Sequence, residues 1–351
     1  MKILILGGCG FVGSNLAVYI KNKYPSYEVI SFDNLQRLGS ELNIIRLKKE
    51  GVVFCHGDIR NIEDLNLINE VEIIIDVSAE ASVLSGLSSN PHKLINTNLL
   101  GTINCLEFAR QQRAQLIFLS SSRVYPIELL NNAKYEENDT HYKWTNNQDI
   151  SGINSMGVSE DFPLVGYRSF YGATKLASEL LINEYVKFYN LEAIINRCGV
   201  ISGPWQMAKV DQGFVALWLI KHCYGGELTY NGYNGQGKQL RDVLHIDDLC
   251  NLIDIQIHNF GIYNRETFNI GGGIENTISL CELTKVCEEL SSNSISIQPA
   301  KEREADIRIY YTNNEKISSI SGWKPVRDVR KTLKDIYSWI SKYENTLRNY
   351  L

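Results

Sequence analysis

The sequence lacks three features that would assign it to other classes of protein. Its apolar runs fall far short of the roughly 18 residues that span a membrane, so we expect no membrane contact. It has no block of lysine or arginine and carries a formal net charge of -5, which argues against a nucleic-acid binder. Its eight cysteines include no CxxC pair, a pattern that fits reduced thiols in the cytoplasm. We expect no metal site.

What remains is the composition of a globular enzyme. The chain has 351 residues, of which 44% are hydrophobic, and this allows one or two domains with a large core. Cys105, Cys198 and Cys250 lie within apolar patterns and are predicted to be small core residues. The apolar run before Cys9 is too short for a signal peptide, so we do not expect its lipoprotein-like LGGC sequence to be processed.

The most informative pattern is a glycine-rich turn between a predicted strand and a predicted helix. Apolar runs at 1–6 and 29–32 predict buried strands, and a helical pattern covers 14–20. Glycines let the backbone approach a pyrophosphate, the helix N-terminus offers N–H groups, and an acid after the second strand binds a ribose. We therefore predict a dinucleotide site. Its expected residues here are Gly7, Gly10, Phe11, Val12, Gly13, Asp33 and Asn34.

The acid also bears on which nicotinamide cofactor is bound. The carboxylate of Asp33 would repel a 2′-phosphate, which favours NAD over NADP. Arg37 could reach a 2′-phosphate, or it could lie along the adenine or in solvent. We expect NAD.

The first half of the chain alternates predicted strands and helices. A strand that leads into a loop is expected at 51–58, strands are expected at 72–77 and 115–120, and a helix is expected around 97–112. This alternation predicts an α/β fold with a doubly wound parallel sheet of the Rossmann type.

Beyond Gly203 the alternation breaks down, although a strand entering a turn at 268–273 and an amphipathic helix at 278–290 are still expected. We predict an NAD-binding domain over 1–200 and a smaller substrate-binding domain over most of 201–351. The chain is expected to recross to the first domain near 240–260.

A polar insert, residues 131–165, interrupts this organisation. It is rich in Asn, Asp and Glu and too long for an ordinary connection, so we interpret it as a functional insert or lid. The alternative is a flexible surface loop without a function of its own.

A second set of residues predicts acid–base chemistry. Tyr171 and Lys175 are four apart and share one helix face, where the cationic lysine would stabilise the phenolate and make the tyrosine a base. The pair alone could be an ordinary surface contact. Serines 120–122 follow a predicted strand, at the edge of a parallel sheet where ligands bind. A nicotinamide, a base and a hydroxyl donor together indicate hydride transfer at a carbinol.

These motifs resemble the extended short-chain dehydrogenases/reductases of the nucleotide-sugar epimerase/dehydratase family over nearly the whole chain. The resemblance implies that Asp58 and Ile59 flank the adenine and that Asn98, in the run NLLGT, supports the core of the site. It implies that Ser121, Tyr171 and Lys175 form the catalytic set, of which Tyr171 and Lys175 also contact the cofactor.

The same resemblance implies how a nucleotide-diphosphate sugar would be held. Arg241, in the run RDVLH, and Arg303, in the run READ, match arginines that bind the diphosphate, and guanidinium groups suit phosphate oxygens. Taken alone, each arginine would be interpreted as a surface ion pair. Gln212 and Asp306 are the further substrate contacts that we expect.

Within the family, the chain is most similar to the CDP-paratose (CDP-tyvelose) 2-epimerases. The matching stretches are 33–35, 56–61, 211–215 and 235–245, together with the polar insert. The similarity implies that C-2 of a CDP-hexose is oxidised by NAD, passes through a keto sugar and regains its hydride on the other face. It also implies a cytoplasmic enzyme of lipopolysaccharide O-antigen biosynthesis, which we expect to be a homo-oligomer.

The sequence departs from the family pattern at two places near the expected site. The family's His-x-Ala-Gly-Gln run is replaced by DVSAE at 76–80, and a lysine and a glycine are replaced by Arg123 and Pro126. Glu80 and Arg123 are therefore candidate substrate contacts, or they could form a buried ion pair. Either arrangement would be compatible with a sugar substrate that differs from that of the CDP-paratose 2-epimerases.

Three other functions remain to be separated from epimerisation. A 4,6-dehydratase needs an Asp-Glu pair after its catalytic hydroxyl residue, and here Ser122 and Arg123 stand there. A decarboxylase acting on a nucleotide-uronate would release carbon dioxide. A non-catalytic NAD-binding protein would not need Ser121, Tyr171 and Lys175, and their presence argues against it.

Overall fold

The computed structural model describes residues 1–87, 90–209, 212–348 and 350. It divides into two compact units, each of which is described by itself. Unit 1 comprises Met1–Val124, Ser169–Arg197 and Leu249–Phe268, and unit 2 comprises Tyr125–Arg168, Cys198–Asp248 and Asn269–Leu351. The domain boundary expected at residue 200 stays a prediction. Asp211, which belongs to one of the matching stretches, lies outside the described residues.

The central sheet has seven strands in the order β14-β10-β5-β4-β1-β2-β3. The pairs β1–β2, β1–β4, β2–β3 and β4–β5 are parallel. Continuous apolar runs form its middle strands because both faces are covered, and Ile3 to Leu6 are fully buried. The doubly wound α/β class is confirmed. The strands are β1 (Lys2–Leu6), β2 (Glu28–Asp33), β3 (Val53–His56), β4 (Ile73–Asp76), β5 (Gln115–Ser121), β10 (Ala193–Cys198) and β14 (Thr267–Ile270).

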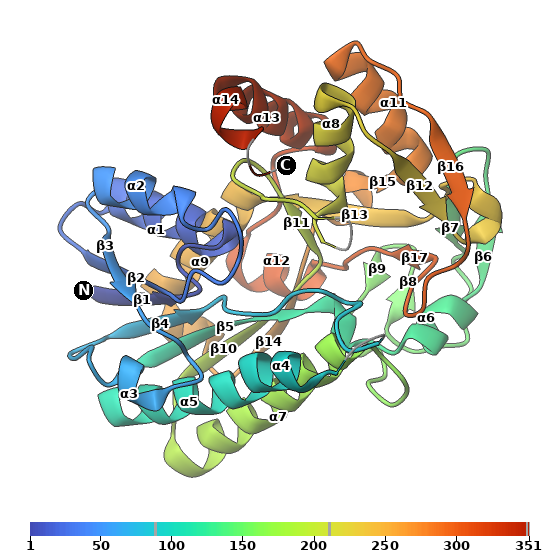
Figure 1. The fold of residues 1–351 in the computed structure, drawn as a ribbon. Helices are drawn as coiled ribbons and strands as arrows, with labels where there is room; N and C mark the ends of the chain where they lie inside the picture. The colour runs from blue at the N-terminus through green and yellow to red at the C-terminus, as the bar shows by residue number, and fades with distance from the viewer. Residues whose placement is uncertain (88–89, 210–211, 349, 351) are drawn as a thin grey trace. The chain divides into compact units, whose positions relative to one another are not determined.

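Helices cover both faces of this sheet in unit 1, with α1 and α2 on one side and α5 and α7 on the other (Figure 1). Phe108 and Ile182, from α5 and α7, pack against Leu4, Ile74 and Leu116 of the strands. The helix expected at 97–112 begins with one turn of π-helix. The helices are α1 (Phe11–Lys23), α2 (Leu42–Lys49), α3 (Ile62–Leu65), α4 (His92–Ile95), the π-helix η1 (Asn96–Leu100), α5 (Gly101–Gln112), the 3-10 helix η2 (Ser122–Val124), α7 (Phe170–Tyr189), α9 (Ile246–His258) and α10 (Phe260–Tyr263).

Unit 2 contains shorter sheets. One has the strand order β11-β13-β15, with β17 also paired to β13, and three pairs stand apart, β12–β16, β6–β7 and β8–β9. The strands are β6 (Tyr135–Glu137), β7 (Tyr142–Trp144), β8 (Ile153–Asn154), β9 (Gly157–Val158), β11 (Val200–Ser202), β12 (Leu228–Asn231), β13 (Leu240–His245), β15 (Thr277–Ser279), β16 (Ile297–Ala300) and β17 (Ile309–Tyr310).

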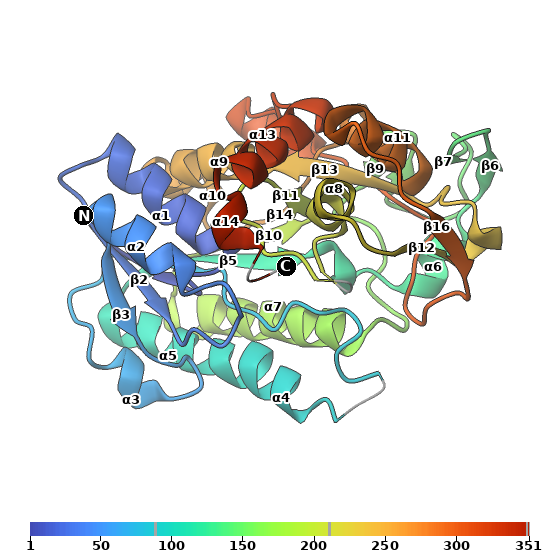
Figure 2. The same ribbon diagram turned by 45° about the horizontal axis from the view of Figure 1, so that its top comes forward.

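The core of unit 2 lies among three helices, α8, α11 and α13, which group together in Figure 2. Leu219, Leu283 and Leu333, one from each helix, are fully buried. Helix α11 starts at a capping box in which Ser279 and Glu282 satisfy each other's backbone N–H groups. The helices are α6 (Ile127–Asn132), α8 (Phe214–Tyr224), η3 (Tyr233–Gly235), η4 (Ile274–Asn276), α11 (Leu280–Ser291), α12 (Glu315–Ser321), α13 (Val329–Lys342) and α14 (Glu344–Leu347).

The polar insert contains regular secondary structure and contributes buried side chains. It forms the antiparallel pairs β6–β7 and β8–β9, and its Trp144 and Phe162 are 2% and 1% exposed. The backbone N–H of Tyr142 donates to the carbonyl of Lys238 at 3.1 Å. A role as a lid stays a prediction.

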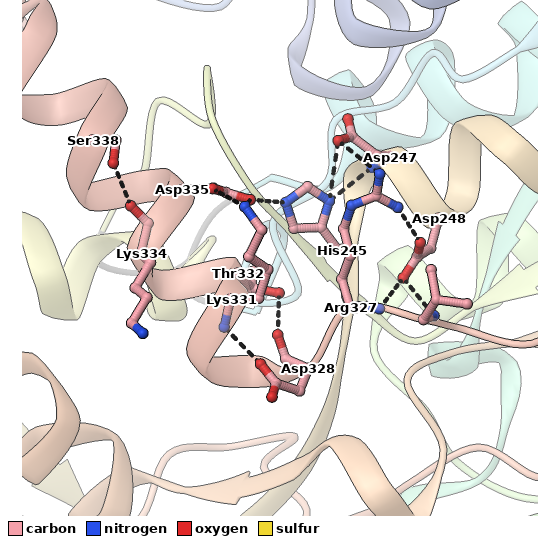
Figure 3. Close-up of polar contacts among 11 residues, drawn as sticks. His245, Asp247, Asp248, Arg327, Asp328, Lys331, Thr332, Lys334, Asp335 and Ser338 are labelled. Carbon is pink, nitrogen blue, oxygen red and sulfur yellow. Dashed lines mark hydrogen bonds and ion pairs between the residues drawn. The ribbon is translucent and has the colours of Figure 1, made fainter.

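His245, the last residue of β13, caps the start of α9 (Figure 3). Its Nδ1 accepts a hydrogen bond from the backbone N–H of Asp247 at 3.0 Å, and its Nε2 lies 3.3 Å from Oδ2 of Asp335 on α13. Arg327 pairs with Asp248 and lies 3.5 Å from Asp247. Because Nδ1 accepts a hydrogen bond, the cap requires a neutral imidazole ring.

The cysteine prediction is confirmed, since Cys105, Cys198 and Cys250 are 1%, 5% and 1% exposed. In the described part of the chain, no helix combines the length and apolar character that a membrane crossing needs. Among the same residues, no group of three or more His, Cys, Asp or Glu side chains is placed to hold a metal ion.

Candidate active site and cofactor cradle

The turn after β1 and the start of α1 need glycine at three positions, Gly7, Gly8 and Gly13. Gly7 has a φ of +75°, and the backbone N–H groups of Gly7 and Gly8 donate to the carbonyl of Phe32 at 2.9 and 3.1 Å. A Cβ on Gly13 would lie 2.3 Å from the Gly7 oxygen, and one on Gly8 would lie 2.7 Å from the Cα of Ser31. The close approach at Gly8 was not predicted from the sequence, although the adjacent glycine pair signals it.

This turn leads into α1 without a side-chain cap. Gly10 is the N-cap residue and makes no side-chain hydrogen bond, and half-buried Phe11 and Val12 begin the helix. The N–H groups of a first helical turn lack intrahelical partners and suit an anion. The bare glycine backbone and the uncapped helix therefore fit the pyrophosphate of a dinucleotide.

The turn 7–10 and the first turn of α1 form what we call the cofactor cradle. Asp33, at the end of β2, completes it. Its carboxylate accepts hydrogen bonds from the backbone N–H groups of Cys9 at 3.0 Å and Leu35 at 2.8 Å. Burial raises the pKa of Asp33, and these hydrogen bonds oppose the rise. The carboxylate is thus held in place beside the turn, as a ribose acceptor must be.

Asp58 and Asn34 form a polar link beside this carboxylate. Asn34 Nδ2 donates to Asp58 at 3.0 Å, and Arg60 binds the same carboxylate at 2.6 Å. The hydrogen bonds from Arg60 lower the pKa of Asp58 to about 2. Ile59 is 6% exposed, and its carbonyl accepts from Asn104 at 2.8 Å. Contact of these residues with adenine stays a prediction.

Asn98 ties the loop after β4 to α7. It lies in the π-helix, is 2% exposed, and exchanges two hydrogen bonds with the backbone of Glu80, at 2.8 and 3.1 Å. Its amide also donates to Thr174 Oγ1 at 3.3 Å. Single turns of π-helix are frequent at functional sites, and here the turn places one amide between two segments of the expected site.

The expected catalytic residues come from the start of α7 and the end of β5. Tyr171 is half-buried in the first turn of α7. Lys175, one turn further on, is 2% exposed and its Nζ donates to the carbonyl of Leu119 at 2.9 Å. Ser121 is 8% exposed and its Oγ accepts from the backbone N–H of Arg123 at 3.2 Å. The fold thus gathers these residues at one end of the sheet.

Two buried acids are neighbours of Lys175, one in space and one along α7, and the sequence did not predict a role for either. Asp76 ends β4 at 1% exposure; burial raises its pKa, and the charge of Lys175 opposes the rise. Glu179, one turn beyond Lys175, pairs with Arg197 at 2.7 Å and accepts from Ser120 Oγ at 2.5 Å. These contacts hold α7 against β5 and β10. A Glu four residues after the lysine on one helix face is the sequence signal that could have identified Glu179.

Glu80 and Arg123, the departures from the family pattern, lie in unit 1. The Glu80 carboxylate is 3.7 Å from Nζ of Lys93, and its side chain is 31% exposed. Glu80 therefore does not form a buried ion pair, because its carboxylate stays accessible to water. Arg123 is half-buried in η2. Contact of either residue with a sugar stays a prediction.

The expected substrate residues Arg241, Arg303, Asp306 and Gln212 belong to unit 2. Arg241 Nη2 donates to Asp306 Oδ1 at 3.1 Å, and Nη1 donates to the carbonyl of Leu240 at 2.8 Å. Burial lowers the pKa of Arg241. Arg303 joins Asp306 through a backbone turn, and Gln212 exchanges two backbone hydrogen bonds with Lys209. Arg241 and Asp306 thus form an ion pair, to which a diphosphate would have to bind as a third partner.

Comparisons with known proteins agree with this architecture. A family model described as the NAD dependent epimerase/dehydratase family matches residues 3–271. The chain is 32% identical over 353 residues to CDP-paratose 2-epimerase from Salmonella typhi, covering 97% of this chain and 99% of that protein. It is 31% identical to dTDP-D-glucose 4,6-dehydratase from Dictyostelium discoideum, covering 78% of this chain and 59% of that protein. The structure of dTDP-glucose 4,6-dehydratase from Bacillus anthracis in complex with NAD matches with a TM-score of 0.79 and 25% identity, covering 100% of both chains.

Proposed function

Because the chain belongs to the NAD dependent epimerase/dehydratase family, we propose that it inverts C-2 of a CDP-hexose through a transient keto sugar. NAD is the cofactor of this family, and its nicotinamide supplies a hydride acceptor when it is bound. The observation that carries the proposal is the 32% identity to CDP-paratose 2-epimerase over 97% of this chain and 99% of that protein.

We assign the proton transfer in this oxidation to Ser121, Tyr171 and Lys175. Tyr171 would take the proton of the C-2 hydroxyl while the hydride leaves the same carbon. The cation of Lys175, fixed on the Leu119 carbonyl at 2.9 Å, favours the phenolate that must accept this proton. Ser121 Oγ would orient the sugar oxygen. The hydride then returns to the opposite face of C-2, and Tyr171 gives the proton back.

The residues that follow Ser121 argue against dehydration. Elimination of water needs an acid and a base at neighbouring carbons. Ser122 and Arg123 occupy the short helix directly after β5, so the expected positions of an acid pair hold a hydroxyl and a cation. We therefore favour epimerisation, although a dehydratase is among the similar proteins.

The decisive experiment is to incubate purified protein with matched CDP-, UDP- and dTDP-hexoses and to analyse the products by NMR. We expect a C-2 epimer from a CDP-hexose, with no added NAD and no accumulation of NADH. Loss of water would instead mark a dehydratase, release of carbon dioxide a decarboxylase, and no product from any sugar a binding protein. The matched control is Tyr171→Phe, which keeps the ring and removes the hydroxyl.

A further inference from the structure

Unit 2 contains a pocket of about 660 Å³ that the polar insert helps to build. One wall is the β6–β7 hairpin of the insert, and the others are η3 and the segment that follows β16. These elements group at one end of unit 2 in Figure 1. The volume is in the range of small-molecule sites, roughly 300–1,000 Å³. Its lining includes the side chains of Tyr135, Tyr142, Tyr233, Glu137, Glu302 and Arg308.

Three tyrosine rings and one guanidinium group give this pocket flat π surfaces. The guanidinium carbon of Arg308 lies 4.2 Å from the ring centroid of Tyr135 and 5.2 Å from that of Tyr233. Tyr142 meets Tyr135 edge to face at 5.4 Å. Arg308 is itself held by the carbonyl of Asn131 at 3.0 Å. Aromatic rings and guanidinium planes are the surfaces on which nucleic-acid bases stack.

Tyr233 shows signs of a functional role. It and Asn234 have φ values of +49° and +60°, a left-handed conformation that costs energy for residues other than glycine and collects at ligand sites. Among the described residues, the buried hydroxyl of Tyr233 has no hydrogen-bond partner. Burial raises the pKa of Tyr233 to about 12, so the hydroxyl stays protonated at neutral pH and can donate a hydrogen bond.

The two carboxylates of the pocket differ in their partners. Glu137 is paired with Lys238 at 2.7 Å. Glu302 is exposed and makes no hydrogen bond or ion pair within the described ranges. An unpaired carboxylate accepts hydrogen bonds and repels acceptors. Cytosine carries an amino group where uracil and thymine carry an oxygen, and carboxylates accept from that amine.

The pocket also adjoins the expected anchor of the diphosphate. Arg241 Nη1 donates to the backbone carbonyl of Arg308 at 3.3 Å, so the stacking guanidinium belongs to a residue that touches Arg241. The base and the diphosphate of a nucleotide are joined through one ribose, so adjoining sites for these two groups suit a nucleotide.

We propose that the pocket receives the base of the nucleotide sugar and that Glu302 selects cytosine over uracil and thymine. The inference rests on the proposed function, which it deepens by assigning the choice of base to this chain's own residues. Tyr135 and Arg308 supply stacking that any pyrimidine would use, and Glu302 supplies the discrimination. The insert thereby contributes to binding of the base rather than to its selection, because its β6 strand carries Tyr135.

The test is calorimetric binding of CDP and of UDP to the purified full-length protein and to three variants. The unmodified protein should prefer CDP. A single base contact discriminates by about 5- to 150-fold, and Glu302→Gln should lose most of that ratio because an amide also donates to the uracil oxygen. Glu136→Gln is the matched control, since this exposed residue lies between Tyr135 and Glu137 on β6 and does not line the pocket. It should keep the full preference.

Tyr135→Leu separates stacking from selection. It should weaken CDP and UDP alike, by about 5- to 150-fold as for other base-stacking rings, and leave their ratio unchanged. Equal affinity of the unmodified protein for CDP and UDP, or an unchanged ratio in Glu302→Gln, would overturn the inference. Its failure is distinct from failure of the proposed function. Nucleotide binding needs no turnover, whereas the absence of a C-2 epimer from the unmodified protein would sink the epimerase proposal alone.

Discussion

Replacing Gly13 by alanine should remove the tightly held NAD that we expect to purify with this protein. An epimerase returns the hydride that it takes, so it never needs to exchange its cofactor, and tight retention costs it nothing in turnover. Gly13 lies in the first turn of α1, packed on the turn that begins at Gly7. The substitution adds one methyl group and no charge, so its effect reports on the fit of the cradle.

The structure gives the size of the disturbance. The added Cβ would lie 2.3 Å from the oxygen of Gly7 and 2.7 Å from the Cα of Gly8, whereas real Cβ atoms stay at least 3.0 Å away. Both neighbours are backbone atoms, so α1 must withdraw from the turn by about 0.7 Å. Overpacking of this kind costs about 1–3 kcal/mol of folding stability. Loss of one hydrogen bond to a charged group costs about 1.5–3 kcal/mol, so NAD should bind about 10- to 150-fold more weakly.

The assay compares bound NAD, its dissociation constant and the melting temperature with those of a matched glycine variant. Gly261→Ala is suitable because Gly261 also lies in a helix, α10, and a Cβ there would meet nothing within 4 Å. We expect this control to retain NAD and to gain up to about 1 kcal/mol of stability, since alanine favours the helix. If Gly13→Ala purifies with a full complement of NAD at unchanged affinity, the cradle does not bind the pyrophosphate.

Two further predictions concern the base and the pH range of stability. Tyr171→Phe should lower kcat by about 10²–10⁴-fold, the usual contribution of a general base, while bound NAD and the melting temperature stay unchanged; near-normal turnover would remove Tyr171 from the mechanism. Burial lowers the pKa of His245 in the folded protein. The contribution of its neutral ring to the free energy of unfolding should therefore be fully present above about pH 6.5, the ordinary pKa of histidine, and should be lost as the pH falls below that value. His245→Asn keeps a capping side chain without a titrating ring, so unfolding by denaturant at several pH values should show a smaller loss towards acid in this variant, and an equal loss in both proteins would contradict the assignment.

The part of the fold that the sequence predicts is the part whose contacts are local or fully buried. β1, β4 and β5 are continuous apolar runs because both faces of their sheet are covered. The cofactor cradle can also be predicted from the sequence, since its glycines and Asp33 lie within one strand–turn–helix–strand segment. The strand expected within 51–58 is β3, Val53–His56. The local pattern does not give its ends, because strand ends depend on pairing with other segments.

The parts that the sequence does not predict depend on pairs of distant residues. Arg241 meets Asp306 across 65 positions, and β12 pairs in parallel with β16 far along the chain. The strands of the polar insert are two or three residues long, too short for an alternating pattern to be seen. The stacking of Arg308 on Tyr135 likewise joins the insert to a segment near the C-terminus. In each case the sequence shows candidate residue types, and only the fold shows their partners.

The last prediction decides how the configuration of the sugar is inverted. In one route the hydride taken from C-2 returns to the same carbon, and the keto sugar turns over while its diphosphate stays anchored. In the other route the neighbouring carbon C-3 is oxidised by NAD instead, and an acid–base side chain removes the C-2 proton to give an enolate. Solvent then supplies the new hydrogen on the other face of C-2, and the hydride returns to C-3. Glu80 is the acid that we nominate for the second route, because its side chain is 31% exposed and lies 3.7 Å from Lys93, within reach of water.

The two routes differ in the origin of the hydrogen on the inverted carbon. Direct return keeps the substrate's own hydrogen, so product formed in D₂O should carry no deuterium at C-2, as measured by NMR and mass spectrometry. We expect this result because Ser122 and Arg123 stand where a dehydratase would need acids. The Glu80→Gln variant is the internal control: under direct return it should change kcat or KM without altering the isotope pattern. Deuterium at C-2 that disappears in Glu80→Gln would show that C-2 is inverted by proton exchange and that Glu80 is the catalytic acid–base. No step of the direct route exposes that carbon to solvent protons.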